Sequence, residues 1–327
     1  MSRRHPLVIG HRGAPGYRPE HSASSYALAL AAGVDAVEPD AVVSRDGVLV
    51  VRHENEISET TDVAARPEFA GRRATCTVDG IERSGWFTED FTADELAGLR
   101  CRERVPALRP ASAAFDDTEP VLRLREVLDL VRAASIDQQR PIGVVLELKH
   151  ATHFGQQGWD VAALVAAELE AAGWLSGDLP LVIESFEQTV LAQLQVRGVP
   201  ATYVYLVKAS GRPYDLVAAQ GAAASTYRSQ LRPAGLDAFA DRFDGISVNK
   251  RLLLLAGSVV ADAHARGLEV YTWTCRPENT FLDRRFRRAG GAGAFGAYEQ
   301  EWAVIRDAGV DGVFVDHPDL GVAFFGA

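Results

Sequence analysis

Short runs of β-branched and other apolar residues alternate along the chain with longer stretches rich in Ala and Leu. The short runs have the length of buried strands, and the longer stretches have the length and composition of helices. The predicted strands are Leu7–Gly10, Ala36–Ala41, Gly143–Leu148, Leu181–Ser185, Thr202–Val207, Gly245–Val248, Glu269–Thr272 and Gly312–Val315. The predicted helices are Ala23–Ala32, Arg123–Ala134, Asp160–Ala172, Gln188–Gln195, Pro213–Ala219, Ala234–Asp241, Ala256–Arg266 and Tyr298–Asp307.

This alternation predicts the fold class. Strands that alternate with helices form a parallel sheet, and eight such units in one chain favour an α/β protein with a (β/α)8 TIM barrel. The alternative is an open, doubly wound sheet, but no GxGxxG turn follows the first strand. We therefore predict a single barrel domain that spans residues 1–327.

One region breaks the alternation. After the second strand, Arg45–Gly47 has the composition of a turn and Val48–Arg52 that of an extra strand, which predicts a hairpin. Residues from about 54 to 120 then carry many charges, glycines and prolines, with one weak helix near Ala93–Leu99. This stretch is too long for an ordinary barrel loop. We interpret it as a subdomain inserted after the second strand, above the C-terminal face of the barrel.

Composition narrows the possible partners. The 327 residues are 47% hydrophobic and 24% charged, which is typical of a folded globular protein and excludes a disordered chain. The net charge of -10 argues against nucleic acid as a partner, although a small phosphate ligand needs only a few cations in one pocket. The three cysteines are too far apart for a disulfide framework or a zinc site.

Targeting signals are weak. No apolar run approaches the roughly 18 residues that a membrane span requires, and the apolar stretch Leu7–Ile9 is too short for a signal peptide. We therefore predict a cytoplasmic protein with no membrane span. The sequence leaves the oligomeric state open.

Candidate catalytic groups gather where the predicted strands end. In barrel enzymes, catalytic side chains lie at the C-terminal ends of the strands. The polar residues at or just after these ends, including the end of the hairpin, are His11, Arg12, Glu38, Asp40, His53, Glu147 and Lys149, together with Glu184-Ser185, Asn249-Lys250 and Asp316-His317. Any one of these would more often be an ordinary polar residue at the barrel rim. Their combination at one rim favours a functional site.

The spacing of the carboxylates predicts a cation. Glu38 and Asp40 are two residues apart on one strand and share a face, as do Glu147 and Lys149. Carboxylates that point into a barrel are costly unless they are paired or bind a cation. Three carboxylates against one lysine predict one divalent cation, and ligands that are all oxygen favour Mg²⁺ or Ca²⁺.

Together these residues resemble the signature of the glycerophosphodiester phosphodiesterases. The first part of the likeness consists of His11-Arg12-Gly13, Pro19-Glu20, Gly33–Asp40, Asp46-Gly47 and His53. It continues with Glu147-Leu148-Lys149, Glu184-Ser185-Phe186, Trp273 and Gly312–Pro318. The matches follow the family's order from residue 11 to about 318. Two segments, Thr60–Val63 and Gly85–Thr88, resemble the insertion of the longer subgroup.

The resemblance implies a reaction and a role for each matching residue. The reaction would be metal-dependent hydrolysis of a small-molecule glycerophosphodiester to sn-glycerol 3-phosphate and an alcohol, with one divalent cation, Ca²⁺ or Mg²⁺. The implied metal ligands are Glu38, Asp40 and Glu147, and the implied acid–base pair is His11 and His53. Arg12 and Lys149 would contact the phosphate, and Glu20 would support the metal side of the site. Trp273 is a candidate for lining the glycerol pocket, with packing inside the barrel as an equal alternative.

The sequence also departs from the family pattern and leaves alternatives open. His21-Ser22 stand where the family usually has Asn-Thr, and Glu54 stands where it often has Asp. One alternative is a phospholipase-type phosphodiesterase, either lysophospholipase D or phosphoinositide-directed. It would need an apolar membrane-facing rim, for which the candidates are Trp86, Phe87 and Phe91. The other is a non-catalytic barrel that binds glycerol phosphates, which the loss of a histidine or metal ligand would mark.

Overall fold

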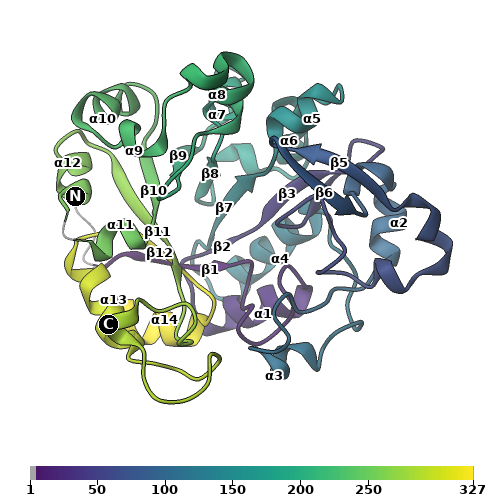
Figure 1. Cartoon of the computed structure of the whole chain (residues 1–327), viewed down its shortest axis with the longest axis horizontal. Helices are drawn as coiled ribbons and strands as arrows, with labels where there is room; N and C mark the ends of the chain where they lie inside the picture. The colour runs from purple at the N-terminus through teal and green to yellow at the C-terminus, as the bar shows by residue number, and fades with distance from the viewer. Residues whose placement is uncertain (1–4, 256, 327) are drawn as a thin grey trace.

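The computed structural model describes residues 5–255 and 257–326, and in this part of the chain eight parallel strands close into a barrel (Figure 1). The second of these strands is split in two, so the barrel elements carry nine labels. They are β1 (Leu7–His11), β2 (Ala36–Glu38), β3 (Asp40–Val43), β7 (Gly143–Leu148), β8 (Leu181–Ser185), β9 (Thr202–Val207), β10 (Gly245–Asn249), β11 (Glu269–Cys275) and β12 (Gly312–Val315). Pairing of β1 with β12 and of β2 with β7 closes the ring. The predicted TIM barrel is confirmed.

The split of the second strand has a local cause. Sequence analysis predicted one strand, Ala36–Ala41, whereas the structure separates β2 from β3 at Pro39, which has no N–H to donate to the ladder. The register against β7 is the same on both sides of the proline, with Ala36 opposite Gly143 and Asp40 opposite Glu147. β3 then runs on to form the predicted antiparallel hairpin with β4 (Leu49–Val51).

Helices surround the barrel largely as predicted (Figure 1). The predicted helices correspond to α1 (Ala23–Ala32), α4 (Leu124–Asp137), α6 (Val161–Ala171), α7 (Gln188–Val196), α8 (Tyr214–Gln220), α10 (Pro233–Ala240), α12 (Val259–His264) and α13 (Tyr298–Asp307). Further helices are α5 (Ala151–Gln156), α9 (Tyr227–Gln230), α11 (Arg251–Leu254) and α14 (Pro318–Phe325). Residue 256, where one predicted helix began, lies outside the described residues. No helix in the described ranges is long and apolar enough to cross a membrane.

The core has two parts. A large cluster of buried side chains fills the space between the strands and the helices. A smaller cluster fills the barrel interior with inward-pointing residues from successive strands, among them Ile9, Val145, Val204 and Phe314. The polar residues at the C-terminal ends of the strands lie directly above this packed layer.

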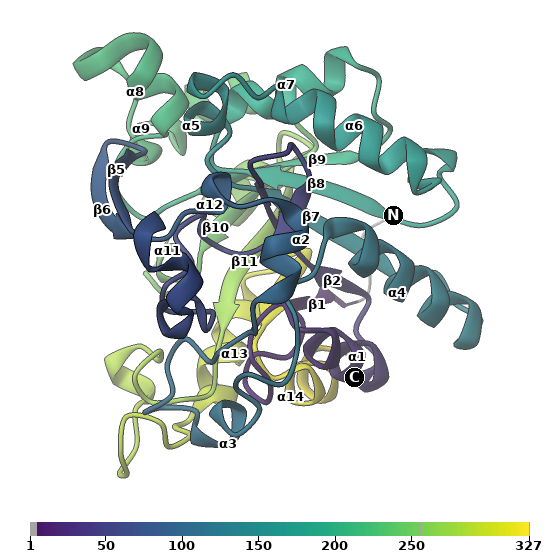
Figure 2. The same ribbon diagram turned by 90° about the vertical axis from the view of Figure 1, so that its right-hand side faces the viewer.

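Residues 54–120 form a separate layer of short elements (Figure 2). They comprise β5 (Ala74–Val78), β6 (Ile81–Gly85), α2 (Ala93–Gly98), α3 (Pro110–Ala113) and 3-10 turns at Val63–Ala65, Pro67–Arg72 and Thr88–Asp90. Trp86, Phe87 and Phe91 are buried here. The apolar membrane-facing rim suggested for these three side chains is therefore not formed.

Candidate active site

A cavity of about 1150 Å³ opens at the carboxyl ends of the barrel strands. Seven of the predicted site residues line it: His11, Arg12, Glu38, His53, Glu147, Lys149 and Trp273. The other two, Glu20 and Asp40, are buried and contact lining residues from behind. Folding thus brings together residues that are up to 262 positions apart in the sequence.

Arg12 connects the first two strands of the barrel. Its backbone N–H donates to the backbone carbonyl of Glu38 at 3.0 Å and to the Glu38 carboxylate at 2.9 Å. Its guanidinium donates to Glu20 at 2.9 Å and lies 3.3 Å from Asp40 Oδ2. Because two carboxylates flank it, this buried cation is fixed in position at the edge of the cavity.

Three carboxylates meet at the floor of the cavity. Glu38, Glu147 and Glu184 each place an oxygen within 4.8 Å of the others, and all three side chains are buried. Burial and the neighbouring carboxylates raise the pKa of Glu38 well above its usual value. Burial raises the pKa of Glu147 to about 8, even though Lys149 opposes the shift. The pKa of Glu184 is also raised, by burial and by Glu147.

Asp40 lies beside this cluster but faces cations. Its Oδ1 is 3.1 Å from Lys149 Nζ, and its Oδ2 accepts a hydrogen bond from His21 Nε2 at 2.9 Å. Burial alone would raise the pKa of Asp40, but Lys149, His53 and Arg12 hold it well below its usual range. Asp40 therefore stays ionised while its neighbours favour protonation.

The donor set fits a hard divalent cation. All the candidate ligand atoms are carboxylate oxygens, which such ions prefer. Within the described residues, Asp40 Oδ1 and Glu184 Oε2 are buried and have no hydrogen-bond partner. Unsatisfied buried oxygens and raised carboxyl pKa values are both relieved when a cation binds among them.

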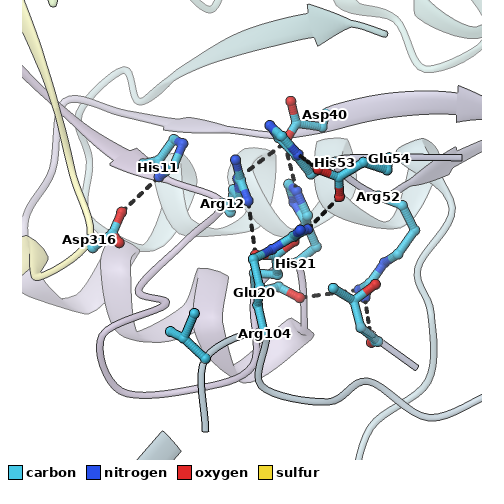
Figure 3. Close-up of polar contacts among 12 residues, drawn as sticks. His11, Arg12, Glu20, His21, Asp40, Arg52, His53, Glu54, Arg104 and Asp316 are labelled. Carbon is cyan, nitrogen blue, oxygen red and sulfur yellow. Dashed lines mark hydrogen bonds and ion pairs between the residues drawn. The ribbon is translucent and has the colours of Figure 1, made fainter. Parts of the chain in front are cut away.

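The two predicted catalytic histidines are each held by a carboxylate. His11 Nδ1 is 2.7 Å from Asp316 Oδ1, and His53 Nδ1 hydrogen-bonds the Glu54 carboxylate. Because Nδ1 is engaged in both rings, Nε2 is the nitrogen left for substrate. Figure 3 shows the two rings on either side of Arg12.

Both imidazoles are neutral at pH 7. Burial and the Arg12 charge lower the pKa of His11 to about 4. Burial, Arg12 and Lys149 lower the pKa of His53 to about 3. Each ring can therefore accept a proton near neutral pH.

An aromatic wall closes one side of the cavity. Trp273 is half-buried, its ring meets Phe186 edge-on at 5.6 Å, and its indole N–H donates to the Ser247 carbonyl at 3.3 Å. Trp273 therefore packs at the top of the barrel interior and also lines the cavity, and its contact with glycerol stays a prediction.

Comparison with known proteins identifies the family. The sequence matches the family described as glycerophosphoryl diester phosphodiesterase over residues 11–320. The chain belongs to this family. Its membership confirms the enzyme class predicted from the sequence, a glycerophosphodiester phosphodiesterase.

Individual relatives cover almost the whole chain. The glycerophosphodiester phosphodiesterase GDPD6 of Arabidopsis thaliana is 29% identical over 95% of this chain and 83% of its own length. A glycerophosphodiester phosphodiesterase of Treponema pallidum is 26% identical over 98% of this chain and 92% of its own.

Solved structures share the fold. A phosphodiesterase of Oleispira antarctica, in complex with the product sn-glycerol-3-phosphate, superimposes with a TM-score of 0.66 at 20% identity, covering 99% of this chain and 98% of its own. A glycerophosphodiester phosphodiesterase of Agrobacterium tumefaciens gives a TM-score of 0.61 at 19% identity, covering 97% and 99%.

The two departures from the family pattern have structural roles here. His21 is fully buried, with Nδ1 2.7 Å from the Tyr26 hydroxyl and Nε2 directed at Asp40, so it holds a carboxylate and does not face substrate. Burial lowers its pKa to about 4, so its Nε2–H donates to Asp40 and its Nδ1 accepts from Tyr26. Glu54 anchors His53, as described above.

Arg104, from the inserted segment, joins two of these groups. Its guanidinium donates to both oxygens of Glu20, at 2.9 and 2.7 Å, and to Glu54 at 2.6 Å (Figure 3). Glu20 in turn holds Arg12, and Glu54 holds His53. Glu20, expected to support the metal side of the site, thus lies between two guanidinium groups, which lower its pKa despite burial.

Several residues of this site were not assigned from sequence. Glu184 and Asp316 stand at strand ends within segments that resemble the family signature, so the sequence contained evidence that they belong to the site. Arg276 and the insertion residues Arg104 and Arg109 carried no such signal. Arg109 and Arg276 each donate to Asp316 at 2.6 Å, and this pairing lowers the pKa of Asp316 well below its usual value.

We predict that Arg104→Gln weakens catalysis by releasing Glu20 and Glu54. Loss of a partly buried ion pair of this kind costs about 1 to 3 kcal/mol in the free energy of unfolding. We expect kcat to fall more than KM changes, because His53 and Arg12 lose their supports. Steady-state kinetics and urea unfolding measure both effects.

Arg102→Gln is the matched control, because Arg102 lies in the same segment and pairs with Asp117 at 2.7 Å on the surface. It should leave kcat unchanged and shift the free energy of unfolding by less than about 1 kcal/mol. Equal effects of the two substitutions on kcat would contradict a positioning role for Arg104.

Proposed function

We propose that this protein hydrolyses glycerophosphodiesters to sn-glycerol 3-phosphate and an alcohol, with the help of one divalent cation. The observation that carries the proposal is the meeting of two neutral imidazoles, two fixed cations and a carboxylate cluster around one cavity. A phosphodiester is an anion whose cleavage requires charge stabilisation and two proton transfers, and this set of groups can provide both. The relatives in Arabidopsis and Treponema carry the name of this activity, and the Oleispira neighbour binds its product.

The proposed cation site uses Glu38, Asp40 and Glu147, with Glu184 as a further ligand candidate. The oxygens of Glu38, Glu147 and Glu184 cluster on the cavity floor, and the buried Glu184 oxygen that lacks a hydrogen-bond partner among the described residues supports the assignment. When bound, Mg²⁺ or Ca²⁺ would act as a Lewis acid toward a phosphate oxygen. Lys149 lies between Glu147, at 2.6 Å, and Asp40, so its charge stays in place beside the cluster.

Arg12 and Lys149 are proposed to bind the phosphate. Both line the cavity, and the neighbouring carboxylates raise both pKa values despite burial, so both side chains are charged near neutral pH. The planar guanidinium of Arg12 suits two oxygens of one phosphate. Because ion pairs already hold these cations, little side-chain freedom is lost when substrate binds.

His11 and His53 are proposed to move the protons. One ring accepts a proton from the nucleophile, which is either water or the glycerol 2-hydroxyl, and the other protonates the leaving alkoxide. The negative charge of the bound phosphate favours the protonated form of a ring next to it. If the 2-hydroxyl attacks, a cyclic phosphate forms and the two histidines exchange roles when water opens it.

The alternatives find less support. A phospholipase-type enzyme would need an apolar rim that faces the membrane. Trp86, Phe87 and Phe91, the candidates for such a rim, are buried in this protein. A non-catalytic barrel would be expected to have lost a histidine or a metal ligand, whereas each predicted position is filled. Product identity separates these functions, because only the proposed reaction releases glycerol 3-phosphate from a water-soluble diester.

The purified protein should release sn-glycerol 3-phosphate from glycerophosphocholine, glycerophosphoethanolamine or glycerophosphoglycerol in a dehydrogenase-coupled assay. A chelator should abolish the release, and Ca²⁺, Mg²⁺ or Mn²⁺ should restore it, because the carboxylates repel one another without a cation. Full activity of a preparation shown to be free of metal would exclude the cation site.

Substitution of either histidine tests the acid–base pair. His11→Ala and His53→Ala should each lower kcat about 10²- to 10⁴-fold, the usual contribution of a general acid or base, while the thermal unfolding temperature changes little. His264→Ala is the control, since His264 pairs with Asp311 on the surface, away from the cavity. Near-native turnover of either cavity variant would rule out its assigned role.

A further inference from the structure

The outer part of the cavity carries more positive charge than any role in the reaction requires. Among the described lining residues, ten are Lys or Arg and seven are Asp or Glu, although the whole chain has a net charge of -10. Six of these cations lie at the mouth and are exposed: Arg83, Lys208, Arg212, Arg251, Arg284 and Arg287. In the described ranges, none of the six forms an ion pair with a carboxylate.

Lys208 shares an aromatic neighbour, Phe186, with Lys149 of the proposed phosphate site. Its Nζ is 4.7 Å from the centre of the Phe186 ring, and Lys149 Nζ is 5.8 Å from the same centre. The two ammonium groups are therefore no more than about 11 Å apart. A small polyol spans such a distance, so a substrate held by Lys149 can reach Lys208 with the far end of its alcohol.

The inserted hairpin adds a second side to this surface. Arg83 comes from β6, and Lys208 and Arg212 come from the loop between β9 and α8. The two segments approach each other, because a Cβ added to Gly80 in the hairpin turn would lie 3.5 Å from the Tyr214 ring. Figure 2 draws the β5–β6 hairpin on the same side of the barrel as α8 and α9.

Carboxylates near this surface are already engaged. Asp79 accepts a hydrogen bond from His150 Nδ1 at 2.6 Å, and its other oxygen is buried without a hydrogen-bond partner in the described part of the chain. Glu187 accepts from the backbone N–H of Thr152 at 2.8 Å and from its hydroxyl, and burial raises the pKa of Glu187 to about 7. Desolvation at the cavity mouth and repulsion by Lys149 lower the pKa of Lys208, although Glu147 and Asp79 oppose the shift. An incoming anion would relieve this repulsion.

We propose that Arg83, Lys208 and Arg212 form a cationic rim that binds a second negative charge, carried by the alcohol part of the substrate. The preferred substrates are then glycerophosphodiesters whose alcohol carries a phosphate, and the least favoured are those with a cationic alcohol such as choline. This inference rests on the proposed function and specifies the substrate class of the same cavity. It also gives the insertion a role, because Arg83 belongs to it.

The test compares three diesters: glycerophosphocholine, glycerophosphoglycerol and glycerophosphoglycerol with a terminal phosphate. Phosphorus NMR follows the loss of the diester. The wild-type kcat/KM should be highest for the compound with the terminal phosphate, and this preference should weaken as salt screens the rim. The double variant Arg83→Gln, Lys208→Gln should raise KM for this compound about tenfold, leave its kcat unchanged, and have little effect on the other two.

Arg228→Gln is the matched control, since Arg228 is an exposed arginine that does not line the cavity. It should change none of the three KM values. Equal kcat/KM for all three diesters, a preference for choline, or a double variant that affects all three alike would overturn the inference. If no diester is cleaved, the proposed function fails. Calorimetric binding still tests the rim in that case, because wild type should bind the compound with the terminal phosphate more tightly than the double variant does.

Discussion

Repulsion among buried carboxylates is the constraint on which the architecture of this site depends. Glu38, Glu147 and Glu184 place oxygens within 4.8 Å of one another on the floor of the cavity, and Asp40 stands beside them. Buried like charges at this distance are costly unless they are protonated or neutralised by a cation. Burial, together with the nearby Asp40 carboxylate, raises the pKa of Glu147 to about 8 despite the opposing charge of Lys149.

The protein partly offsets this repulsion with its own cations, which are in turn held by further ion pairs. Arg12 and Lys149 neutralise Asp40, and Glu20 and Arg104 then fix Arg12 from the far side. Asp316 holds His11 while Arg109 and Arg276 neutralise Asp316. Each group that would contact substrate is thus held by a charged partner, which keeps the site in position before substrate arrives.

The inserted segment is part of the site through these partners. Arg104 and Arg109 both come from it, and both end on carboxylates that hold a cavity residue. The predicted helix of this region, observed as α2 (Ala93–Gly98), follows from local sequence, whereas the β5–β6 hairpin was not predicted. The contacts of the two arginines do not follow from local sequence, because they join positions that are 84 and 207 residues apart in the chain.

The sequence predicted the placement of site residues best where the residues come from one strand. Glu38 and Asp40 come from one predicted strand, and the register of its two halves, β2 and β3, against β7 is unbroken across Pro39. The tight cluster, however, contains Glu184 in place of Asp40, because Lys149 and His21 attract the Asp40 carboxylate. Spacing along one strand cannot reveal which neighbour from another strand lies closest, since that depends on charges brought in by the fold.

The most direct test of this account is to locate the cation. Crystals of the protein grown with Mn²⁺ should give an anomalous-scattering peak among the carboxylates of Glu38, Asp40, Glu147 and Glu184, at the distances of direct oxygen coordination. The proposed account predicts one strong peak there. A Mn²⁺ peak elsewhere in the cavity, with these four carboxylates not coordinating it, would contradict the claim that a cation relieves their repulsion.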